Sequence, residues 1–510
     1  MKRGKVYLIG AGPGDPGLIT LKGIECIRKA DVIVYDYLAN SKLLEYANKD
    51  VEFIYVGKKG GDHTYSQSQI NSIIIQRARE DKVVARLKGG DPFIFGRGGE
   101  EAEELVASGV SFEIVPGVTS AIAVPAYAGI PLTHRDFTSN VAFITGHEDP
   151  TKDESSIAWD KISTGIGTLV FLMGVKNLQK IVKNLIKNGR DPMTPVAIIR
   201  WGTLGRQDTV TGTLETIIEL AKEKNITSPV ITVIGDVVGL RDKLNWFETK
   251  PLFGKKIIVT RARSQASEFT NLLREYGAEP IEFPIIEVRP PLSFDTLDKA
   301  IDNLEKYDWL ILTSVNGVRF FFERLRTRGR DVRDLKGIKI CAIGPRTAGD
   351  IEKSGINIDF VPDEYKAEAI LEGLKKIGIE GKNILLPRAE EAREILPEEI
   401  RKSGGNIDVV IAYKNVKPLE DKETIKGLLK EGIIDVITFT SSSTVKNFAE
   451  MFERDELLSL IKGITVASIG PITAETAKKL GIKTDIMPEN YTIPDLTYAI
   501  IDYYLKPSLS

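Results

Sequence analysis

A glycine-rich loop near the start of the chain holds the first residues that could do chemistry. Gly12–Gly17 reads GPGDPG, fits the spacing G-x-G-x-x-G after an apolar run, and precedes Asp36 by 19 residues (36 − 17). This pattern is typical of a dinucleotide-binding site. Pro13 and Pro16, however, have no N–H to offer a pyrophosphate, and Asp15 adds a negative charge where the pyrophosphate would lie. The loop therefore favours a cofactor with a cationic centre and no phosphate, and a nicotinamide-dependent oxidoreductase stays as an alternative.

Hydroxyl side chains recur in the rear of the chain at a fixed interval. GKKIIVTRA from Gly254 recurs as GKNILLPRA from Gly381 (381 − 254 = 127), and IGPRTA from Ile343 recurs as IGPITA from Ile469 (469 − 343 = 126). Matches in one register indicate an internal duplication. In that register, hydroxyl residues end an apolar strand or begin a helix, and these are Thr313, Ser314, Thr440, Ser441, Thr347 and Thr473.

Such hydroxyls, together with the free backbone N–H groups at helix starts, bind carboxylates well. Ligands of α/β lobes bind at the carboxyl ends of the strands. Two similar lobes facing each other across a cleft would therefore suit a ligand that carries many carboxylates. The alternative is that each hydroxyl only caps its own helix.

Short apolar runs predict the strands that position these residues, and polar or helical stretches separate them as in an α/β fold with a largely parallel sheet. In the front half the predicted strands are residues 5–9, 32–35, 83–87, 112–115, 141–145, 168–173, 196–200 and 230–234. Residues 116–131 predict a helix-bearing connector between two α/β units. The pattern breaks at residues 245–254, where Pro251 and Gly254 predict the main domain boundary.

Length and composition limit the class of protein. A chain of 510 residues is too long for a single core, and a formal net charge of −2 argues against a nucleic-acid partner. Cys26 and Cys341 lie far apart, and the three histidines have no second ligand at useful spacing, so we expect neither a disulfide nor a metal site. Without a signal peptide or an apolar run of about 18 residues, we expect a cytoplasmic protein outside the membrane.

Several long motifs of the front half resemble those of uroporphyrinogen-III C-methyltransferases, within the tetrapyrrole methylase family, over nearly all of residues 5–247. The matching segments are VYLIGAGPGDPGLIT, ADVIVYD, VGKKGGDHTYSQ, RLKGGDPFIFGRGGEE, VPGVTSAIAVPAYAGIPLTHR, FITGH, TLVFLMG and VAIIRWGT. The resemblance implies two α/β lobes, about residues 1–117 and 118–247, that hold S-adenosylmethionine and release S-adenosylhomocysteine. It also implies a homodimer formed through this half.

Carried over position by position, the resemblance implies a set of cofactor-binding residues: Pro13, Gly89, Gly90, Asp91, Ile94, Thr119, Ser120, Met173 and Gly202. Ser120 stands where family members often have alanine. The resemblance also implies that Asp36 accepts a proton and that Lys58 donates one. A turn residue at the end of a strand is the alternative for Asp36.

The rear half, over roughly residues 252–505, resembles uroporphyrinogen-III synthase through KKIIVTRA, YDWLILTSVNGVRFFF, AIGPRTA, LLPRA, ITFTSSSTV and ASIGPITAETAKKLG. The resemblance implies a domain at residues 252–510 with discontinuous lobes, one of residues 252–285 and 418–510, the other of residues 290–412. Tyr413 would lie on a linker and face the cleft, where its phenol could assist the loss of a hydroxyl group. The alternative for Tyr413 is packing alone.

Together these resemblances predict a bifunctional enzyme of tetrapyrrole biosynthesis. It would cyclise hydroxymethylbilane to uroporphyrinogen III and then methylate carbons 2 and 7 with S-adenosylmethionine, giving precorrin-2 on the way to siroheme and cobalamin. Two alternatives stay open: methylation of a different tetrapyrrole, and a rear half that binds carboxylates without catalysis.

Overall fold

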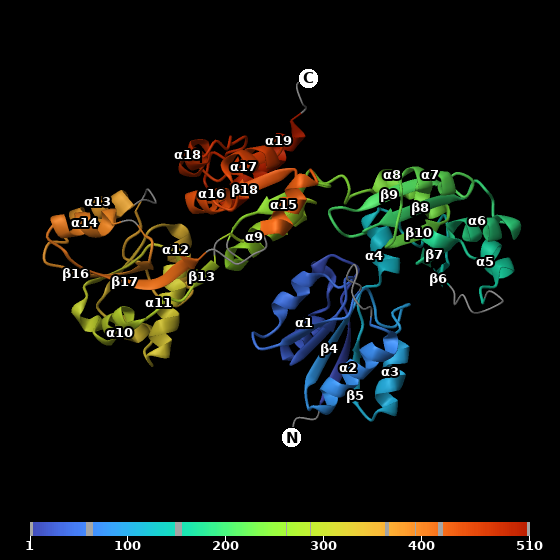
Figure 1. Ribbon diagram of the computed structural model, residues 1–510, viewed down its shortest axis with the longest axis horizontal. Helices are drawn as coiled ribbons and strands as arrows, with labels where there is room; N and C mark the ends of the chain where they lie inside the picture. Colours follow the sequence, from blue (N-terminus) through green and yellow to red (C-terminus); the bar gives the residue numbers. More distant parts are fainter. Residues whose placement is uncertain are drawn as a thin grey trace. The chain divides into compact units, whose positions relative to one another are not determined.

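A computed structural model of the chain describes residues 4–57, 65–147, 156–261, 263–285, 287–362, 367–392, 394–416 and 422–506. Its strands form four sheets (Figure 1). Residues 1–257, 271–280 and 501–510 make one compact unit, and residues 258–270 and 281–500 make another. The domain and lobe boundaries expected from the sequence stay predictions.

The first sheet has the strand order β3-β2-β4-β1-β5, and its printed neighbours pair in parallel. Its strands are β1 (Lys5–Gly10), β2 (Val32–Tyr35), β3 (Glu52–Tyr55), β4 (Val83–Lys88) and β5 (Ser111–Val115). The sequence predicted all of these except β3, a partly exposed edge strand that lacks a long apolar run.

Helices cover both faces of this sheet (Figure 1). They are α1 (Leu21–Lys29), α2 (Gln67–Arg79) and α3 (Gly98–Ala107). Side chains alternate along a strand, so Val84 packs with α2 and α3, whereas Ala85 and Leu87 pack with α1. By the same alternation Arg86 and Lys88, at the carboxyl end of β4, belong to the face that α2 and α3 cover.

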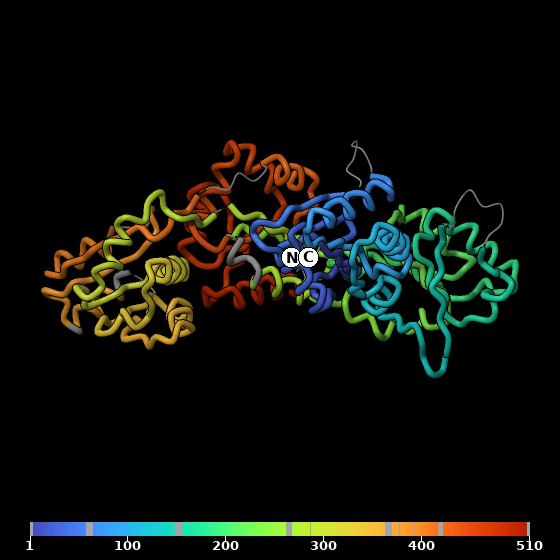
Figure 2. Tube along the Cα trace, turned by 90° about the horizontal axis from the view of Figure 1, so that it is seen from below, coloured from blue at the N-terminus to red at the C-terminus, as the bar shows by residue number. Residues whose placement is uncertain are grey.

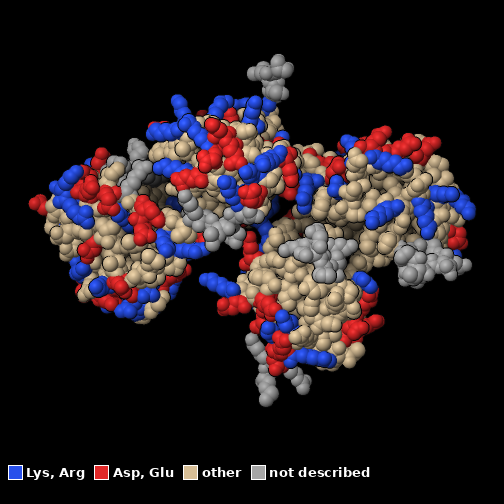
Figure 3. All heavy atoms as spheres, viewed as in Figure 1, with Lys and Arg blue, Asp and Glu red and all other residues tan. Residues whose placement is uncertain are grey.

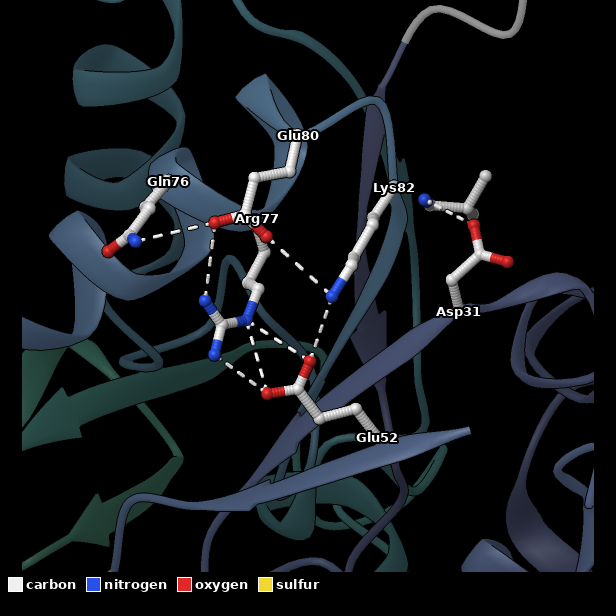
Figure 4. A network of polar contacts seen from close by, with 7 residues as sticks. Asp31, Glu52, Gln76, Arg77, Glu80 and Lys82 are labelled. Atoms are coloured by element: carbon white, nitrogen blue, oxygen red, sulfur yellow. Dashed lines mark hydrogen bonds and ion pairs between the residues drawn. The ribbon is translucent and has the colours of Figure 1, made fainter. Parts of the chain in front are cut away.

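Ion pairs join α2 to the strands at the amino-terminal edge of the first sheet (Figure 4). Arg77 donates to both carboxylate oxygens of Glu52, at 2.7 and 3.1 Å, and Lys82 donates to one of them at 3.1 Å. Asp31 accepts a hydrogen bond from the Val83 backbone N–H at 2.8 Å. These contacts lie at the opposite edge from the loops that follow the strands, and so they have a structural role.

The second sheet has the order β6-β7-β10-β8-β9, and it is largely antiparallel. Only β6 (Val141–Thr145) and β7 (Thr168–Leu172) pair in parallel, and the other strands are β8 (Pro195–Arg200), β9 (Asp208–Thr213) and β10 (Val230–Ile234). The helices of this part are α4 (Ser120–Tyr127), α5 (Trp159–Gly165), α6 (Leu178–Lys187), α7 (Ile217–Glu223) and α8 (Arg241–Leu244). The helix of the predicted connector is α4.

The rear of the chain forms the third and fourth sheets. The third has the order β12-β11-β18-β19, and its strands are β11 (Lys256–Val259), β12 (Glu279–Glu282), β18 (Val436–Phe439) and β19 (Thr465–Ser468). The helices that precede or follow its strands along the chain are α9 (Arg263–Glu275), α15 (Lys422–Lys430), α16 (Ser442–Ala449), α17 (Arg454–Leu460), α18 (Pro471–Lys479) and α19 (Ile493–Leu505).

The fourth sheet has the order β13-β17-β16-β14-β15 and pairs segments that lie far apart in sequence, seen as yellow beside orange in Figure 2. Its strands are β13 (Glu287–Arg289), β14 (Trp309–Leu312), β15 (Lys339–Ala342), β16 (Asn383–Ala389) and β17 (Asn406–Val416). Its helices are α10 (Asp295–Asp302), α11 (Val315–Thr327), α12 (Pro345–Glu352), α13 (Ala367–Ile377) and α14 (Ile395–Lys402).

The structure confirms the internal duplication. Strand β14 recurs as β18 at an offset of 127 (436 − 309), and α12 recurs as α18 at an offset of 126 (471 − 345). The strand orders β16-β14-β15 and β11-β18-β19 are equivalent. Even isolated bridges repeat, because Cys341 pairs with Phe360 as Ala467 pairs with Ile486.

The surface fits the near-neutral composition. On the face shown in Figure 3, basic and acidic side chains are interspersed over each part of the chain. Among the described residues, no helix is long and apolar enough to cross a membrane.

Candidate active sites

Four glycines bring the loops after β1, β4 and β5 into direct backbone contact. The Gly90 N–H donates to the Gly12 carbonyl at 2.7 Å, and the Gly12 N–H donates back at 3.2 Å. A Cβ on Gly10 would lie 2.4 Å from Gly117 Cα, and a Cβ on Gly117 would lie 2.4 Å from the Gly90 carbonyl oxygen. Gly90 has a φ of +70°, which glycine adopts without strain. Sequence reasoning did not single out Gly10 or Gly117, although both stand in the quoted motifs.

Asp91 organises the turn that follows this crossing. One carboxylate oxygen accepts the Phe93 N–H at 2.8 Å, and the other accepts the Gly117 N–H at 2.9 Å. The residue therefore joins the loop after β4 to the loop after β5. Each carboxylate oxygen can accept further hydrogen bonds, so this role is compatible with a ligand contact.

The start of α4 lies against the same crossing. Thr119 is the N-cap of α4, is buried, and its hydroxyl accepts the Ala121 N–H at 3.3 Å. Ser120 begins the helix, and its backbone nitrogen lies 3.6 Å from the position of a Cβ on Gly90. Gly202 packs on α4 so closely that a Cβ would lie 2.4 Å from the Val124 side chain.

Two of the predicted apolar contacts are open to solvent. Ile94 is 37% exposed and Met173 is 49% exposed. Leu172 packs in the same core as Ala121 and Val124, which brings the next residue, Met173, beside α4. The structure thus brings six of the predicted cofactor residues to the glycine crossing and α4, namely Gly90, Asp91, Thr119, Ser120, Met173 and Gly202.

Most N–H groups in and directly after the GPGDPG loop are used within the protein. Asp15 N–H donates to the Thr203 hydroxyl at 3.0 Å, Gly17 N–H donates to the Asp15 carboxylate at 2.8 Å, and Leu18 N–H donates to the Asp15 carbonyl at 3.1 Å. The Tyr127 hydroxyl also donates to the Asp15 carboxylate, at 2.8 Å. Burial and this bond raise the pKa of Tyr127. Since Pro13 and Pro16 have no N–H, the loop is poorly suited to a pyrophosphate.

These observations test the fit of S-adenosylmethionine, a cationic sulfonium joined to an adenosine and an amino acid. The glycine crossing packs the loops after β1, β4 and β5 against one another, and the exposed Ile94 and Met173 offer apolar surface for an adenine. The loop that suits no phosphate removes the main competing ligand class. The residues present therefore fit this cofactor.

Asp36 follows β2 at the carboxyl edge of the first sheet. One carboxylate oxygen accepts the Leu38 N–H at 3.0 Å, and the other pairs with the Arg86 guanidinium at 3.2 Å, while 22% of the side chain stays exposed. Sequence reasoning did not predict the Arg86 contact. Lys58, the predicted proton donor, lies outside the described residues.

In the rear half, two of the predicted hydroxyls cap helices. Ser314 caps α11, with its hydroxyl accepting the Gly317 N–H at 2.9 Å. Ser441 caps α16 by accepting the Thr444 N–H at 3.2 Å. Their backbone angles are nearly the same, with φ of −164° and −165°. A capping role, the alternative considered for all these hydroxyls, is thus present at both serines.

The four threonines behave differently. Thr347 and Thr473 are the third residues of α12 and α18, where a glycine is the N-cap, and both are only 5% exposed. Thr313 and Thr440 are partly buried residues directly before the capping serines. Within the described part of the chain, none of the four hydroxyls has a hydrogen-bond partner. Within the described residues, these four threonine hydroxyls therefore do not cap the helices that follow them.

Tyr413 lies in β17, directly before the residues that pair with β13, and it is only 6% exposed. Its hydroxyl shares a hydrogen bond of 2.9 Å with the Ser314 hydroxyl, and its ring stacks on Phe320 at 5.7 Å between centroids. Burial raises the pKa of Tyr413. The chain beyond Tyr413 pairs with β13 through Lys414–Val416.

Known proteins match both halves of the chain. Tetrapyrrole (Corrin/Porphyrin) Methylases match residues 5–218, and Uroporphyrinogen-III synthase HemD matches residues 267–498. Porphyrin biosynthesis protein HemD of Ruminiclostridium josui is 39% identical over 502 residues, which are 98% of this chain and 98% of that one. S-adenosyl-L-methionine-dependent uroporphyrinogen III methyltransferase of Methanosarcina barkeri is 56% identical over 241 residues, 47% of this chain and 94% of that one.

A solved structure, the uroporphyrin-III-C-methyltransferase of Thermus thermophilus, is 39% identical and covers 48% of this chain and 96% of that one, with a TM-score of 0.40. The fold and the sites define a chain of two joined α/β enzymes, a methyltransferase followed by a synthase of the lyase class. The chain belongs to the tetrapyrrole methylase family in its front half and to the uroporphyrinogen-III synthase family in its rear half. It is a bifunctional protein of tetrapyrrole biosynthesis. Both resemblances and the α/β fold class are confirmed.

Proposed function

We propose that the front half methylates uroporphyrinogen III at carbons 2 and 7 with S-adenosylmethionine, giving precorrin-2 toward siroheme and cobalamin. The observation that carries the cofactor assignment is the glycine crossing of Gly10, Gly90 and Gly117 beside a loop in which the Asp15 and Gly17 N–H groups are already hydrogen-bonded. A relative that is 56% identical is named for the same cofactor and for uroporphyrinogen III, which supports the acceptor.

Each predicted residue has a role in this proposal. Gly89, Gly90 and Gly202 let the backbone approach the cofactor, Asp91 holds its amino or hydroxyl groups, and Ile94 and Met173 cover its apolar part. When bound, the cofactor supplies an electrophilic methyl group, and the protein chiefly has to align the attacking carbon with it. Asp36 accepts the proton that the methylated carbon loses, and Lys58 donates one.

We propose that the rear half closes the ring of hydroxymethylbilane to give uroporphyrinogen III. Ring closure requires the two ends of a linear polyanion to meet, so holding its carboxylates should supply much of the catalysis. Thr313, Thr347, Thr440 and Thr473, with the N–H groups of their helix starts, bind carboxylates of the substrate. Ser314 orients Tyr413, whose neutral phenol assists the loss of the hydroxyl group.

We further propose that the chain forms a homodimer through its front half, with tetrapyrroles as its small-molecule partners. Light scattering of the full chain checks this state, and a monomeric mass at micromolar concentration would contradict it.

Calorimetric titration of the full chain tests the cofactor assignment. We expect S-adenosylhomocysteine to bind and NAD to give no heat of binding. Binding of NAD without a response to S-adenosylhomocysteine would contradict the proposal. An Asp36→Asn chain should bind S-adenosylhomocysteine normally and lose methyl transfer, and full methyl transfer by this variant would remove Asp36 from its proposed role.

A further inference from the structure

A cluster of buried charges lies directly behind Asp36. Arg86 and Lys88 on β4 have side chains 5% and 6% exposed, and Glu101 on α3 has a side chain 1% exposed. The proposed function assigns no role to any of these three. They belong to one continuous sequence motif, RLKGGDPFIFGRGGEE.

One oxygen of Glu101 collects the contacts of the cluster. Lys88 Nζ lies 2.5 Å from Glu101 Oε1, Gln67 Nε2 donates to the same oxygen at 3.0 Å, and Arg86 Nε lies 3.6 Å from it. The other oxygen, Oε2, is buried and has no hydrogen bond among the described residues. Glu101 stands in the first turn of α3, where the helix dipole favours a carboxylate.

Arg86 connects this buried carboxylate to the exposed one. Its guanidinium lies between Glu101 and Asp36, with one terminal nitrogen 3.2 Å from Asp36 Oδ2 and the other donating to the Leu87 carbonyl at 2.8 Å. The Asp36 carboxylate thus has its contacts from Arg86 on one side and from the Leu38 N–H on the other. The orientation of the Asp36 carboxylate therefore depends on the position of the Arg86 guanidinium.

The two cations, Arg86 and Lys88, are neutralised only when both carboxylates, Glu101 and Asp36, are present. Two buried cations would be costly without their counter-charges, and removing one partner of a buried pair leaves the other uncompensated. Burial, with the neighbouring Arg86, already lowers the pKa of Lys88, while Glu101 opposes that effect. Glu101 therefore supplies the buried counter-charge that both cations of β4 share, by a hydrogen bond to Lys88 and by an ion pair of 3.6 Å to Arg86, whose Nε has no hydrogen-bond partner among the described residues.

We propose that Glu101 is a positioning residue of the methyltransferase, which holds Arg86 so that Arg86 fixes the carboxylate of Asp36 toward the methyl acceptor. This inference rests on the proposed role of Asp36 as proton acceptor. It gives a physical reason for the joint presence of Arg86, Lys88 and Glu101 in one long motif.

The test compares full-chain variants at saturating S-adenosylmethionine. Glu101→Gln should lower kcat for methyl transfer by about tenfold or more, since misplacing a reacting group by 1 Å can cost about a hundredfold. The affinity for S-adenosylhomocysteine should change by less than about twofold, because Glu101 lies outside the predicted cofactor contacts. Glu101→Asp, which keeps the charge, should recover part of the rate.

The matched control is Glu52→Gln, at the opposite edge of the same sheet. Glu52 also pairs with one arginine and one lysine, Arg77 and Lys82 (Figure 4). This variant should leave kcat and cofactor affinity unchanged. Equal losses of kcat in the two variants would show that Glu101 acts through stability alone and would overturn the inference.

The pH dependence of kcat gives a second readout that a purely structural role would not move. Among the described residues, the charged or titratable groups that interact with Asp36 are Arg86, Lys88 and Tyr37. In Glu101→Gln, Arg86 loses its other carboxylate, so the acid limb of the profile should move to lower pH. In Lys88→Met, Arg86 is the only cation left to pair with Glu101. Arg86 then stabilises the Asp36 carboxylate less, so the acid limb of the profile should move to higher pH.

Shifts in the same direction, or no shift in either variant, would overturn the inference. The Lys88→Met measurement keeps the test decisive if Glu101→Gln does not fold. An Asp36→Asn variant separates the two claims. If it abolishes methyl transfer while Glu101→Gln has no effect, only the positioning role fails. If Asp36→Asn retains full activity, the proposed role of Asp36 fails.

Discussion

Asp91 illustrates how much backbone organisation one side chain of the methyltransferase supplies. It accepts N–H groups from Phe93 and from Gly117, which lie in two different loops. The sequence motif predicted a ligand contact at this position, but it contained no sign of these internal bonds. With the proposed role of Asp91 in cofactor binding, loop order and ligand binding would depend on the same carboxylate.

Asp91→Ala should weaken the binding of S-adenosylhomocysteine by about 1–3 kcal/mol, because two backbone N–H groups lose their acceptor. Titration calorimetry of the full chain measures the change, and synthase activity should stay as it is. Asp136, whose side chain is 77% exposed, supplies the control variant Asp136→Ala. Normal methylation by Asp91→Ala at limiting cofactor would show that the site is wrongly assigned.

Tyr413→Phe should lower the rate of type III uroporphyrinogen formation without abolishing it. The raised pKa keeps the phenol of Tyr413 neutral up to at least its ordinary pKa of about 10. No alkaline loss of synthase activity from Tyr413 is therefore expected below that pH. The ratio of type III to type I product, measured from pH 6 to 9, checks both points, and an unchanged ratio throughout would leave Tyr413 with packing alone.

The same raised pKa has a consequence for stability. A folded-state pKa above the unfolded one contributes stability that is complete below pH about 10 and is lost as the pH rises through the folded value. Denaturant unfolding of the wild-type chain should therefore become easier above pH 10, and Tyr413→Phe should show less of this decline. An equal decline in both chains would mean that other groups cause it.

At the level of residues, the long motifs predicted which residues lie at the ends of strands. They did not predict which side chains contact one another. Thr119, Gly90 and Asp91 lie together because each follows a strand of one parallel sheet, which the order of apolar runs and loops already indicated. The contact of Arg86 with Asp36 depends on β4 lying next to β2. Strand order of that kind is not readable from a single sequence.

Among the elements, the tight crossing of three loops is the feature most open to test. Gly117→Ala would place a Cβ 2.4 Å from the Gly90 carbonyl oxygen, so the loops must separate. We expect a loss of stability of about 1–3 kcal/mol from this overpacking, together with weaker cofactor binding. Gly99→Ala, in a helix position with open space, is the control and should be neutral or slightly stabilising. Thermal unfolding distinguishes the two, and equal melting temperatures would contradict the crossing.

The duplicated helix starts make a second prediction at this scale. Thr347→Val and Thr473→Val should each lower synthase activity by roughly two- to tenfold, the cost of one lost hydrogen bond, and the double variant should lose more. Neither should affect stability strongly, since each hydroxyl has no partner within the described residues. Steady-state kinetics with hydroxymethylbilane measures this. Full activity in the double variant would mean that the threonines only pack.

The elements that sequence reasoning missed have a common physical cause. Edge strands β3 and β9 are partly exposed, so their apolar patterns are weak. The largely antiparallel second sheet was also not foreseen, because apolar runs reveal strands but not their direction. The duplication, in contrast, was readable from the sequence alone, since short matches recur at offsets of 126 and 127.

For the whole molecule, the two proposed activities are consecutive steps carried by one chain. The proposed product of the rear half is the proposed substrate of the front half. Because the two sites use different residues, disabling one should leave the other active. This independence allows each activity to be followed in the full chain.

The most direct test of the central claim supplies the full chain with hydroxymethylbilane and methyl-labelled S-adenosylmethionine. We predict a product with two labelled methyl groups, at carbons 2 and 7, as seen by NMR. Omitting the cofactor, or using Asp91→Ala at limiting cofactor, should instead let uroporphyrinogen III accumulate. Formation of type I uroporphyrinogen alone, or of type III without any methyl label at saturating cofactor, would contradict the proposed pair of activities.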